Sequence, residues 1–592
     1  MKKHTRRIIV LALVSVFILL SACGQAAPPA QTAEETTTAA ATTTVEATTA
    51  AATEATTAAA AAATTAAAAT TTVAAATTAA ATEAATTAAA VQSFEKPATL
   101  SYWAEIDSRM VKFSETKTTA PTFVEFANRT GIKFEFIHPP SGMASEQFRV
   151  LVSSQDLPDI IEYDWFSNYP GGPSRAISDG VIIDLTPYWV PEICPYILNV
   201  LDEYEDEFHL SKEIKTINGE YYVFPCVRGG LIDQVNNGLS MRNDWLKELG
   251  LSVPETLDEV YEALIAFRDV KGCSAPLAAN DLGYLKDSNV FVGAFGIGNS
   301  FYIDEQDYIR YGPAEPAYRG YYEYMAKLYA EKLIDQDFAT NTSDNIMRNV
   351  TTGQTGAVIG QNDTPNGMIL AAMAEADPSY DPIGVPYPKL NASDPKPRIF
   401  KFDYFYTTSG CAAITTSCKY PEAAAWALDY WYGEEGHILG NFGIEGESFY
   451  YGDDGQVYFS DLITRNPDGA TLKEMVVLWS RAAGSAPLVR NVRVVDLQRD
   501  DHRIIDMTDV WSDIPNRSAM VPRLIFTEEE NTRLSKLRSD LTSYVDEMYL
   551  KFIMGRSSLD AEYDIYLQTI KEIGYDEILD IYNTAYGRYK NS

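Results

Sequence analysis

The sequence predicts an α/β fold in which a mostly parallel sheet carries helices on both faces, divided over more than one lobe. The first observation is that strand-like and helix-like segments alternate from residue 98 onward. The second is the length of 592 residues, because a single hydrophobic core stops growing well below that size. The third is a helical pattern of apolar residues that runs from Thr527 toward the end of the chain.

The N-terminal residues have the composition of an export signal. A basic start is followed by an apolar run over residues 8–20, which is too short to span a bilayer of about 30 Å. The run ends in Leu20-Ser21-Ala22-Cys23-Gly24. This ending resembles the bacterial lipobox, in which the cysteine is acylated with a fatty acid such as palmitate and the peptide is cut just before it. We therefore predict a lipoprotein signal peptide over 1–22 and a lipid anchor at Cys23. An ordinary export signal with an incidental cysteine is the alternative.

The next segment, over residues 24–93, consists almost entirely of alanine and threonine. Such a composition cannot bury enough apolar surface to offset the entropy of the chain. We predict that residues 23–94 form the lipidated cysteine and a disordered tether. The folded body would then lie at the extracellular face of the bacterial cell membrane.

The first elements of the body follow from local patterns. Residues 98–103 predict a strand, and residues 156–163 predict a loop that runs into another strand. Residues 132–137 alternate with the period of a strand. Between them, residues 121–129 and 145–154 predict helices, the first of them closed by Thr-Gly. Strands and helices that alternate at this spacing predict a parallel sheet.

Polar and aromatic side chains follow two of these strands, where ligands bind in parallel sheets. A sugar presents hydroxyl groups and slightly apolar faces, so it is recognised by carboxylates, amides and aromatic rings. The candidates are Trp103, Glu105 and Asp107 after the first strand, and Tyr163, Asp164 and Trp165 after the third. Core packing of the aromatic residues is the alternative.

Several motifs, in order, resemble a known family. They are Thr-Gly-Ile-Lys at 130–133, Ser-Ser-Gln-Asp-Leu-Pro-Asp-Ile-Ile at 153–161, Met-Arg-Asn-Asp-Trp-Leu-Lys-Glu-Leu-Gly-Leu at 241–251, Pro-Glu-Thr-Leu-Asp-Glu at 254–259, Gly-Ile-Glu-Gly-Glu at 443–447 and Lys-Phe-Ile-Met-Gly at 551–555. The chain resembles the extracellular solute-binding proteins of ABC importers, in particular the large lipoprotein subgroup called LplA-like, within the family 1 type of sugar binders.

The resemblance implies a two-lobed, type II periplasmic-binding-protein-like fold with discontinuous lobes and a helical C-terminal region. It places the first lobe at 95–235 plus about 400–470. The second lobe, with the C-terminal helices, would comprise 236–399 plus about 471–592.

The same resemblance suggests further ligand-binding residues. Asn236 lies on the first crossing between lobes, and Tyr404 lies near the return crossing. Gln361 and Asn362 end a strand that resembles one running into the family's cleft, and Glu445 lies in a Gly-Ile-Glu-Gly turn. For Asn236 and Glu445, a structural turn is an equally good interpretation.

Composition and missing motifs exclude other functions. The net charge of −34 argues against nucleic acid, because no basic field would neutralise phosphates. H-E-x-x-H, Walker A and G-x-S-x-G motifs are absent, so we predict no enzyme activity, no catalytic residue and no cofactor. The stretch over residues 268–276, where many relatives carry a calcium loop, lacks clustered oxygen ligands, so we predict no metal.

The resemblance and the residues together predict a cell-surface lipoprotein that binds an extracellular solute. The expected ligand is a carbohydrate, specifically an oligosaccharide, which hinge closure would deliver to the transmembrane subunits of an ABC permease. We expect a monomer. A surface glycoside hydrolase or lyase and a stalked adhesin are the alternative functions.

Overall fold

The computed structural model describes residues 94–591, except residues 231–232, 236, 280–281, 363–364, 399–402, 483, 485, 500 and 514–516. The predicted signal peptide, the lipid anchor at Cys23 and all but the last residue of the tether lie outside the described residues. The described chain has an α/β architecture with two main sheets, each associated with its own hydrophobic core. The predicted fold class is confirmed.

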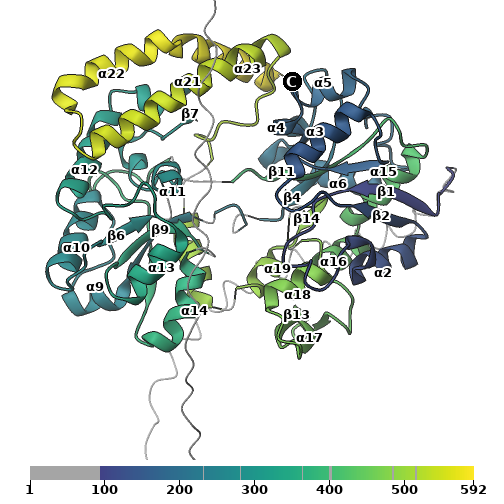
Figure 1. Cartoon of the computed structure of the whole chain (residues 1–592), viewed down its shortest axis with the longest axis horizontal. Helices are drawn as coiled ribbons and strands as arrows, with labels where there is room; N and C mark the ends of the chain where they lie inside the picture. Colours follow the sequence, from purple (N-terminus) through teal and green to yellow (C-terminus); the bar gives the residue numbers. More distant parts are fainter. Residues whose placement is uncertain are drawn as a thin grey trace, which may run out of the picture. The chain divides into compact units, whose positions relative to one another are not determined.

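The sheet of the first lobe has six strands in the order β14-β4-β11-β3-β1-β2. Their bounds are Thr99–Trp103 for β1, Lys133–Ile137 for β2, Ile160–Glu162 for β3, Phe224–Arg228 for β4, Tyr406–Ile414 for β11 and Leu488–Arg490 for β14. β1 pairs in parallel with both β2 and β3, whereas β11 runs antiparallel to β3 and β4. The carboxyl ends of β1, β2 and β3 therefore meet at one edge of the sheet (Figure 1).

Local sequence explains these first elements. The helix α2, Pro121–Thr130, starts with a proline at its first turn and ends at Gly131, whose φ of 75° suits glycine. Its buried Phe126 stacks on Phe134 of β2 with ring centroids 4.7 Å apart. The predicted strands at 98–103, 132–137 and 159–163 and helices at 121–129 and 145–154 all form, with ends shifted by at most a few residues.

Helices and a hairpin complete the first lobe. They are η1 Lys117–Thr119, α3 Ala144–Ser154, α4 Trp165–Asn168, α5 Gly172–Ser178, α6 Pro195–Glu203, α7 Glu205–Phe208, α8 Leu210–Glu213, α15 Pro421–Asp429, η5 Tyr430–Tyr432, α16 Glu434–Phe442, β12 Phe449–Tyr451, β13 Val457–Phe459, α17 Asp461–Thr464, α18 Leu472–Trp479 and α19 Val492–Leu497.

The sheet of the second lobe has four strands in the order β10-β5-β9-β6, which span Pro382–Val385, Asn237–Arg242, Ala357–Gln361 and Leu277–Ala279 respectively. β5 is buried along its whole length. A Cβ atom on its Gly238 would lie 2.4 Å from the indole of Trp511, so only glycine fits there. Trp511 in turn donates a hydrogen bond from Nε1 to the carbonyl oxygen of Leu239 at 3.1 Å.

The other elements of the second lobe are mostly helices. They are α9 Asn243–Leu249, α10 Leu257–Asp269, α11 Leu282–Asp287, η3 Val292–Phe295, β7 Phe301–Ile303, β8 Ile309–Tyr311, η4 Gly312–Ala314, α12 Tyr318–Ala330, α13 Ser343–Thr351, α14 Asn366–Ala376, α20 His502–Ser512, α21 Glu528–Ile553, α22 Leu559–Ile573 and α23 Tyr575–Asn591.

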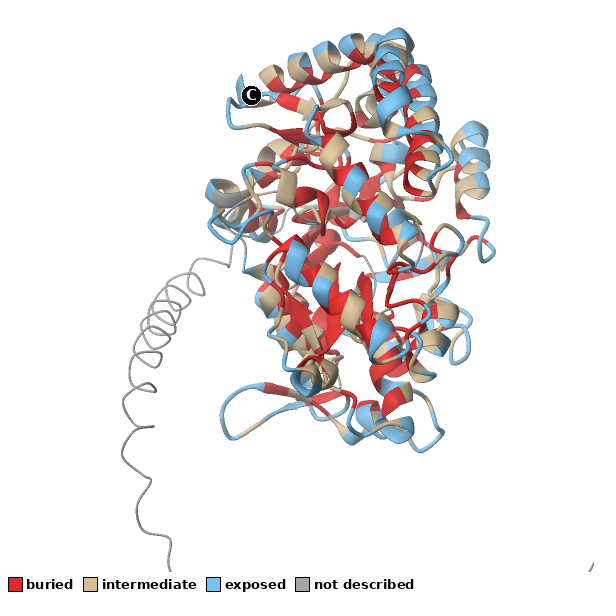
Figure 2. Cartoon of the chain, turned by 90° about the vertical axis from the view of Figure 1, so that its left-hand side faces the viewer, coloured by how far each residue is buried: buried red, intermediate tan, exposed pale blue. Residues whose placement is uncertain are grey.

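The long helix α21 begins where the sequence predicts. Thr527 and Glu530 form a capping box, in which each side chain accepts a hydrogen bond from the backbone N–H of the other residue. Leu534, Leu541 and Val545 are buried, so the apolar stripe of this helix belongs to the second core. Figure 2 shows the same division, with buried residues on the inner faces of helices and exposed residues on their outer faces.

The chain passes between the two cores three times. The first core draws on residues from Leu100 to Val227 and from Phe405 to Val494, and the second core on Val235 to Tyr387 and Ile504 to Tyr586. The last change of lobe therefore falls near residue 498. The sequence had predicted it near residue 470. The reason is that β14 joins β4 in parallel at the edge of the first sheet, which keeps the neighbouring helices in that lobe.

Membrane-spanning helices can be looked for only among the described residues. Among them, no helix combines the length and the apolar character that a membrane span requires.

Candidate functional site

A polar hollow lies at the carboxyl ends of the three neighbouring parallel strands. It has a volume of about 600 Å³. Its wall comes from residues 105–108 after β1, 139–142 after β2 and 162–164 at the end of β3, with Ser409 and Gly410 of β11. Lys117, Asn168 and Gly484 complete the lining. The topology therefore forms a hollow at the edge where the sequence predicts a ligand.

Four of the predicted ligand-binding residues line this hollow: Glu105, Asp107, Tyr163 and Asp164. Glu105 is exposed, and the other three are half-buried. Burial raises the pKa of the Tyr163 hydroxyl, and the charge of Glu105 adds to that effect. Their contact with a ligand stays a prediction.

Two of the carboxylates are held by neighbouring groups. Asp107 accepts hydrogen bonds from the backbone and guanidinium of Arg109 at 2.5–2.9 Å, and these bonds hold the pKa of its carboxyl below the usual range. Asp164 caps the short helix α4 by accepting from the backbone N–H of Ser167 at 2.9 Å. Its other oxygen accepts from Thr408 Oγ1 at 2.8 Å, so β11 fixes the rotamer of this side chain.

The two predicted tryptophans lie beneath the hollow. Trp103 and Trp165 are only 3% and 1% exposed, and both belong to the first core. Trp165 donates from Nε1 to the carbonyl oxygen of Ile161 at 3.2 Å. Trp103 meets the ring of Tyr163 edge to face at 5.4 Å, so it supports a residue of the hollow. In this conformation neither indole is exposed in the hollow, and its contact with a ligand remains a prediction.

The predicted residues of the second lobe and of the crossings lie elsewhere. Gln361 ends β9, and the buried Asn362 donates from Nδ2 to Thr508 Oγ1 at 3.0 Å. Tyr404 donates its hydroxyl to the carbonyl oxygen of Val521 at 3.1 Å. None of these residues lines the hollow.

Two predicted ligand-binding residues remain, Glu445 and Asn236. Glu445 is exposed in a turn before β12 and does not line the hollow, and Asn236 lies outside the described residues.

A buried network beneath the hollow was not predicted. Glu162, at the end of β3, accepts from the Tyr102 hydroxyl at 2.6 Å and from Arg481 Nη2 at 3.2 Å. The guanidinium of Arg481 lies over the ring of Trp431 at 4.4 Å. Burial raises the pKa of Tyr102 well above its usual value, and the charge of Glu162 adds to this shift. Glu162 itself reaches the hollow, so the network supplies part of its floor.

His138 positions the backbone of Lys117 at the edge of the hollow. Its Nε2 accepts from the backbone N–H of Lys117 at 3.1 Å, so the ring proton lies on Nδ1, which donates to the carbonyl oxygen of Ala104 at 2.7 Å. Burial lowers the pKa of His138, which favours this neutral ring.

The hollow is connected to the crossings between the lobes. Arg490 of β14 donates from Nη2 to the carbonyl oxygen of Gly484 at 2.7 Å and from Nη1 to Asp233 at 2.9 Å. Asp233 lies on the first crossing, and the backbone N–H of Asp403 on the second crossing donates to the carbonyl oxygen of Gln234 at 3.0 Å. The two crossings are thus bonded to each other and to the edge of the hollow.

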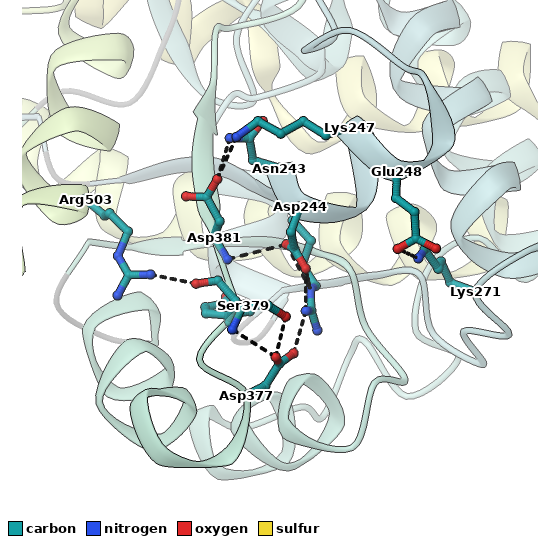
Figure 3. A network of polar contacts seen from close by, with 11 residues as sticks. Asn243, Asp244, Lys247, Glu248, Lys271, Asp377, Ser379, Asp381 and Arg503 are labelled. Carbon is teal, nitrogen blue, oxygen red and sulfur yellow. Dashed lines mark hydrogen bonds and ion pairs between the residues drawn. The ribbon is translucent and has the colours of Figure 1, made fainter. Parts of the chain in front are cut away.

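The family-like motif around Arg242 has a structural role in the second lobe. Arg242 donates to Asp244 at 2.5 Å and to Asp377 at 2.7 Å, at the end of β5 that lies away from the crossing. Figure 3 shows Asp244 and Asp377 in this network. Arg503 of α20 donates to the carbonyl oxygen of Tyr380 at 2.6 Å in the same network. These bonds tie the start of α9 to the loop before β10.

The described residues contain no group of three or more His, Cys, Asp or Glu side chains arranged to hold a metal ion. The absence of a metal site in the whole protein stays a prediction.

The chain is similar to a family of proteins and to individual proteins. The family described as "Bacterial extracellular solute-binding protein" matches residues 114–438, which is more than half of the chain. Lipoprotein LipO of Bacillus subtilis is 25% identical over 345 residues, which cover 56% of this chain and 64% of LipO. The fructooligosaccharide ABC transporter substrate-binding protein FusA of Streptococcus pneumoniae is 22% identical over 494 residues, which cover 78% of this chain and 85% of FusA.

A solved structure shares the fold. It is an HMO-binding, ABC-transporter-associated solute-binding protein from Bifidobacterium longum infantis, with a TM-score of 0.66 and 18% identity. The similarity covers 83% of this chain and 99% of that one.

Proposed function

Because the chain belongs to the family of bacterial extracellular solute-binding proteins, we propose that it captures an oligosaccharide outside the cell. The observation that carries this proposal is the polar hollow of about 600 Å³ at the carboxyl ends of β1, β2 and β3. Carboxylates, a tyrosine and an ammonium group line it, and these groups suit sugar hydroxyls. The names of FusA and of the Bifidobacterium protein, which refer to oligosaccharide or HMO binding, point the same way.

We further propose delivery to an ABC permease by closure of the two lobes. A ligand that contacts both lobes stabilises the closed form by its differential affinity for that form. The three crossings supply the connection about which the lobes would close. Arg490, which bonds both Asp233 of the first crossing and Gly484 of the hollow, places the hollow next to that connection. The ligand leaves chemically unchanged, and the receptor acts as a monomer.

The anchor proposal rests on the lipobox-like segment at Cys23 and on the lipoprotein name of LipO. Growth of expressing cells with an alkyne-bearing fatty acid tests it. We expect the native chain to be labelled and the Cys23→Ala variant to remain unlabelled. Equal labelling of both chains would contradict lipidation at this cysteine.

Isothermal titration calorimetry tests the capture of a sugar. Kestose, raffinose, maltotriose and xylotriose are titrated separately into the purified mature chain, and the recovered sugars are then separated by chromatography. We expect saturable binding of at least one oligosaccharide, with a dissociation constant of about 10 μM or lower, and recovery of that sugar intact. Cleavage of the sugars without saturable binding would favour a glycoside hydrolase instead.

A further inference from the structure

Lys117 is the one cationic side chain that lines the hollow, among the residues that the structure describes. Granting the proposed function, we propose that Lys117 hydrogen-bonds the captured sugar and that the hollow selects uncharged oligosaccharides over those built from uronic acids. Neither the family match nor the relatives assign this residue or this preference.

The ammonium group of Lys117 has unused hydrogen-bonding capacity. Its Nζ lies 3.6 Å from Glu162 Oε1, which is longer than a normal hydrogen bond, and 5.8 Å from the ring centroid of Phe136. The side chain is 20% exposed, and the described residues offer its Nζ no acceptor at hydrogen-bond distance. The ammonium group of this half-buried side chain carries three N–H donors, so a sugar oxygen in the hollow is suited to accept from it.

Glu162, the nearest acceptor, is committed to other groups. One of its oxygens already accepts from Tyr102 at 2.6 Å and from Arg481 at 3.2 Å. Arg481 has no other carboxylate partner among the described residues, and its Nε and Nη1 have no hydrogen bond. The other oxygen, Oε1, forms an ion pair with Lys117 at 3.6 Å, which is too long for a hydrogen bond. Lys117 therefore lines the hollow with its N–H donors still available to a ligand.

The other charged groups of the hollow, which are carboxylates, determine which ligand can bind beside Lys117. Glu105, Asp107, Glu162 and Asp164 all line the hollow beside the single ammonium. Asp107 is paired with Arg109 and Asp164 with backbone and hydroxyl donors, whereas Glu105 has no hydrogen bond or ion pair within the described chain. Among the charged groups of the hollow, Lys117 thus offers N–H donors and Glu105 offers an acceptor, and both suit sugar hydroxyls.

A uronate would meet repulsion in the same place. Its carboxylate would gain one attraction, to Lys117, and would be repelled by Glu105 and Asp164, which have no cationic partner among the described residues. A neutral hydroxyl loses nothing from those charges and accepts from Lys117. We expect the native chain to bind a neutral oligosaccharide at least about tenfold more tightly than a uronate oligosaccharide of the same length.

A glycan array tests both parts of the inference. It carries neutral fructo-, gluco-, xylo- and manno-oligosaccharides beside oligogalacturonides and alginate fragments of the same lengths. The purified mature chain is compared with Lys117→Met, and with Lys133→Met as the control. Lys133 is an exposed residue of β2 outside the hollow, so its variant removes the same charge from the same lobe.

We expect the native chain and Lys133→Met to bind neutral glycans alike, and Lys117→Met to bind them at least about tenfold more weakly. Thermal unfolding of each variant checks that it is folded. In the native chain, added salt should also narrow the difference between neutral and uronate glycans, because it screens the repulsion. This second readout does not depend on any variant.

Two results would overturn the inference while leaving the proposed function intact. They are equal or tighter binding of the uronate glycans by the native chain, and native affinity in a folded Lys117→Met variant. Binding of no glycan at all by the folded native chain would instead remove the proposed function itself.

Discussion

Glu213 places a nearly buried carboxyl group where the first lobe contacts the C-terminal helix. It lies at the end of α8 and is 8% exposed. Its oxygens accept from the backbone N–H of Arg523 at 3.3 Å and from the Tyr589 hydroxyl at 3.2 Å. Burial raises the pKa of Glu213 to about 7, and the nearby charge of Arg523 opposes the rise without cancelling it.

The raised pKa makes a prediction about stability and pH. The folded protein holds this proton up to about pH 7, whereas the unfolded chain releases it near the usual pKa of 4.5. The contribution of this group to stability is therefore present below pH 4.5 and is lost as the pH rises through 7. We expect Glu213→Gln, which stays neutral, to melt about 2–6 °C above the native chain at pH 8 but close to it at pH 5.

Circular dichroism melts at the two pH values measure this difference. Glu529→Gln serves as the matched control, because Glu529 is exposed at the start of α21. The control should melt like the native chain at both pH values. A difference between Glu213→Gln and the native chain that does not change with pH would contradict the assignment.

Residues of the site were predictable only where a local pattern reveals their position. Glu105 and Asp164 lie just beyond the ends of β1 and β3, two strands that the sequence predicts from local patterns. Both residues line the hollow. Glu162 lies within such a strand, where nothing local distinguishes it. Its partner Arg481 is 319 residues away, so only the folded sheet brings the two together. Lys117 carries no local signal either.

At the scale of elements, α21 depends on its N-terminal cap. Thr527 Oγ1 accepts from the backbone N–H of Glu530 at 3.2 Å, and Glu530 accepts from the N–H of Thr527 at 2.8 Å. Thr527→Ala removes the first of these bonds and leaves a helix N–H without its partner. We expect a loss of about 1 kcal/mol in the free energy of unfolding, measured by chemical denaturation, with Thr527→Ser close to native.

Thr532→Ala provides the comparison inside the same helix. Thr532 is exposed, and its hydroxyl donates back to the carbonyl oxygen of Glu528 at 2.9 Å. Alanine has the higher helix propensity, so this change should leave stability equal or slightly higher. Equal losses from the alanine substitutions at 527 and 532 would contradict a specific role for the cap.

The sequence predicts where helices and strands form better than it predicts which lobe each of them joins. Alternation in β2 and the proline and glycine at the ends of α2 are local signals, and both elements form where they predict. The sequence analysis assigned residues 471–497 to the second lobe, but α18, β14 and α19 pack in the first core. That assignment depends on which sheet β14 joins, and a three-residue strand carries no information about its partner.

At the scale of the whole described chain, two cores are joined by three crossings. The first two crossings are bonded to each other through Asp403 and Gln234, and Arg490 connects the first of them to the hollow. A ligand in the hollow therefore lies next to the segments about which the lobes would close. Under the proposed function, this arrangement would couple the capture of a sugar to closure of the lobes.

A crystal structure of the mature chain with its tightest-binding array glycan would show where the sugar is held. We expect a sugar in the hollow beyond β1, β2 and β3, with a sugar oxygen within about 3.2 Å of Lys117 Nζ and a second contact from the other lobe. A glycan bound outside this hollow, or held by one lobe without any contact to the second, would rule out capture between the lobes at this hollow.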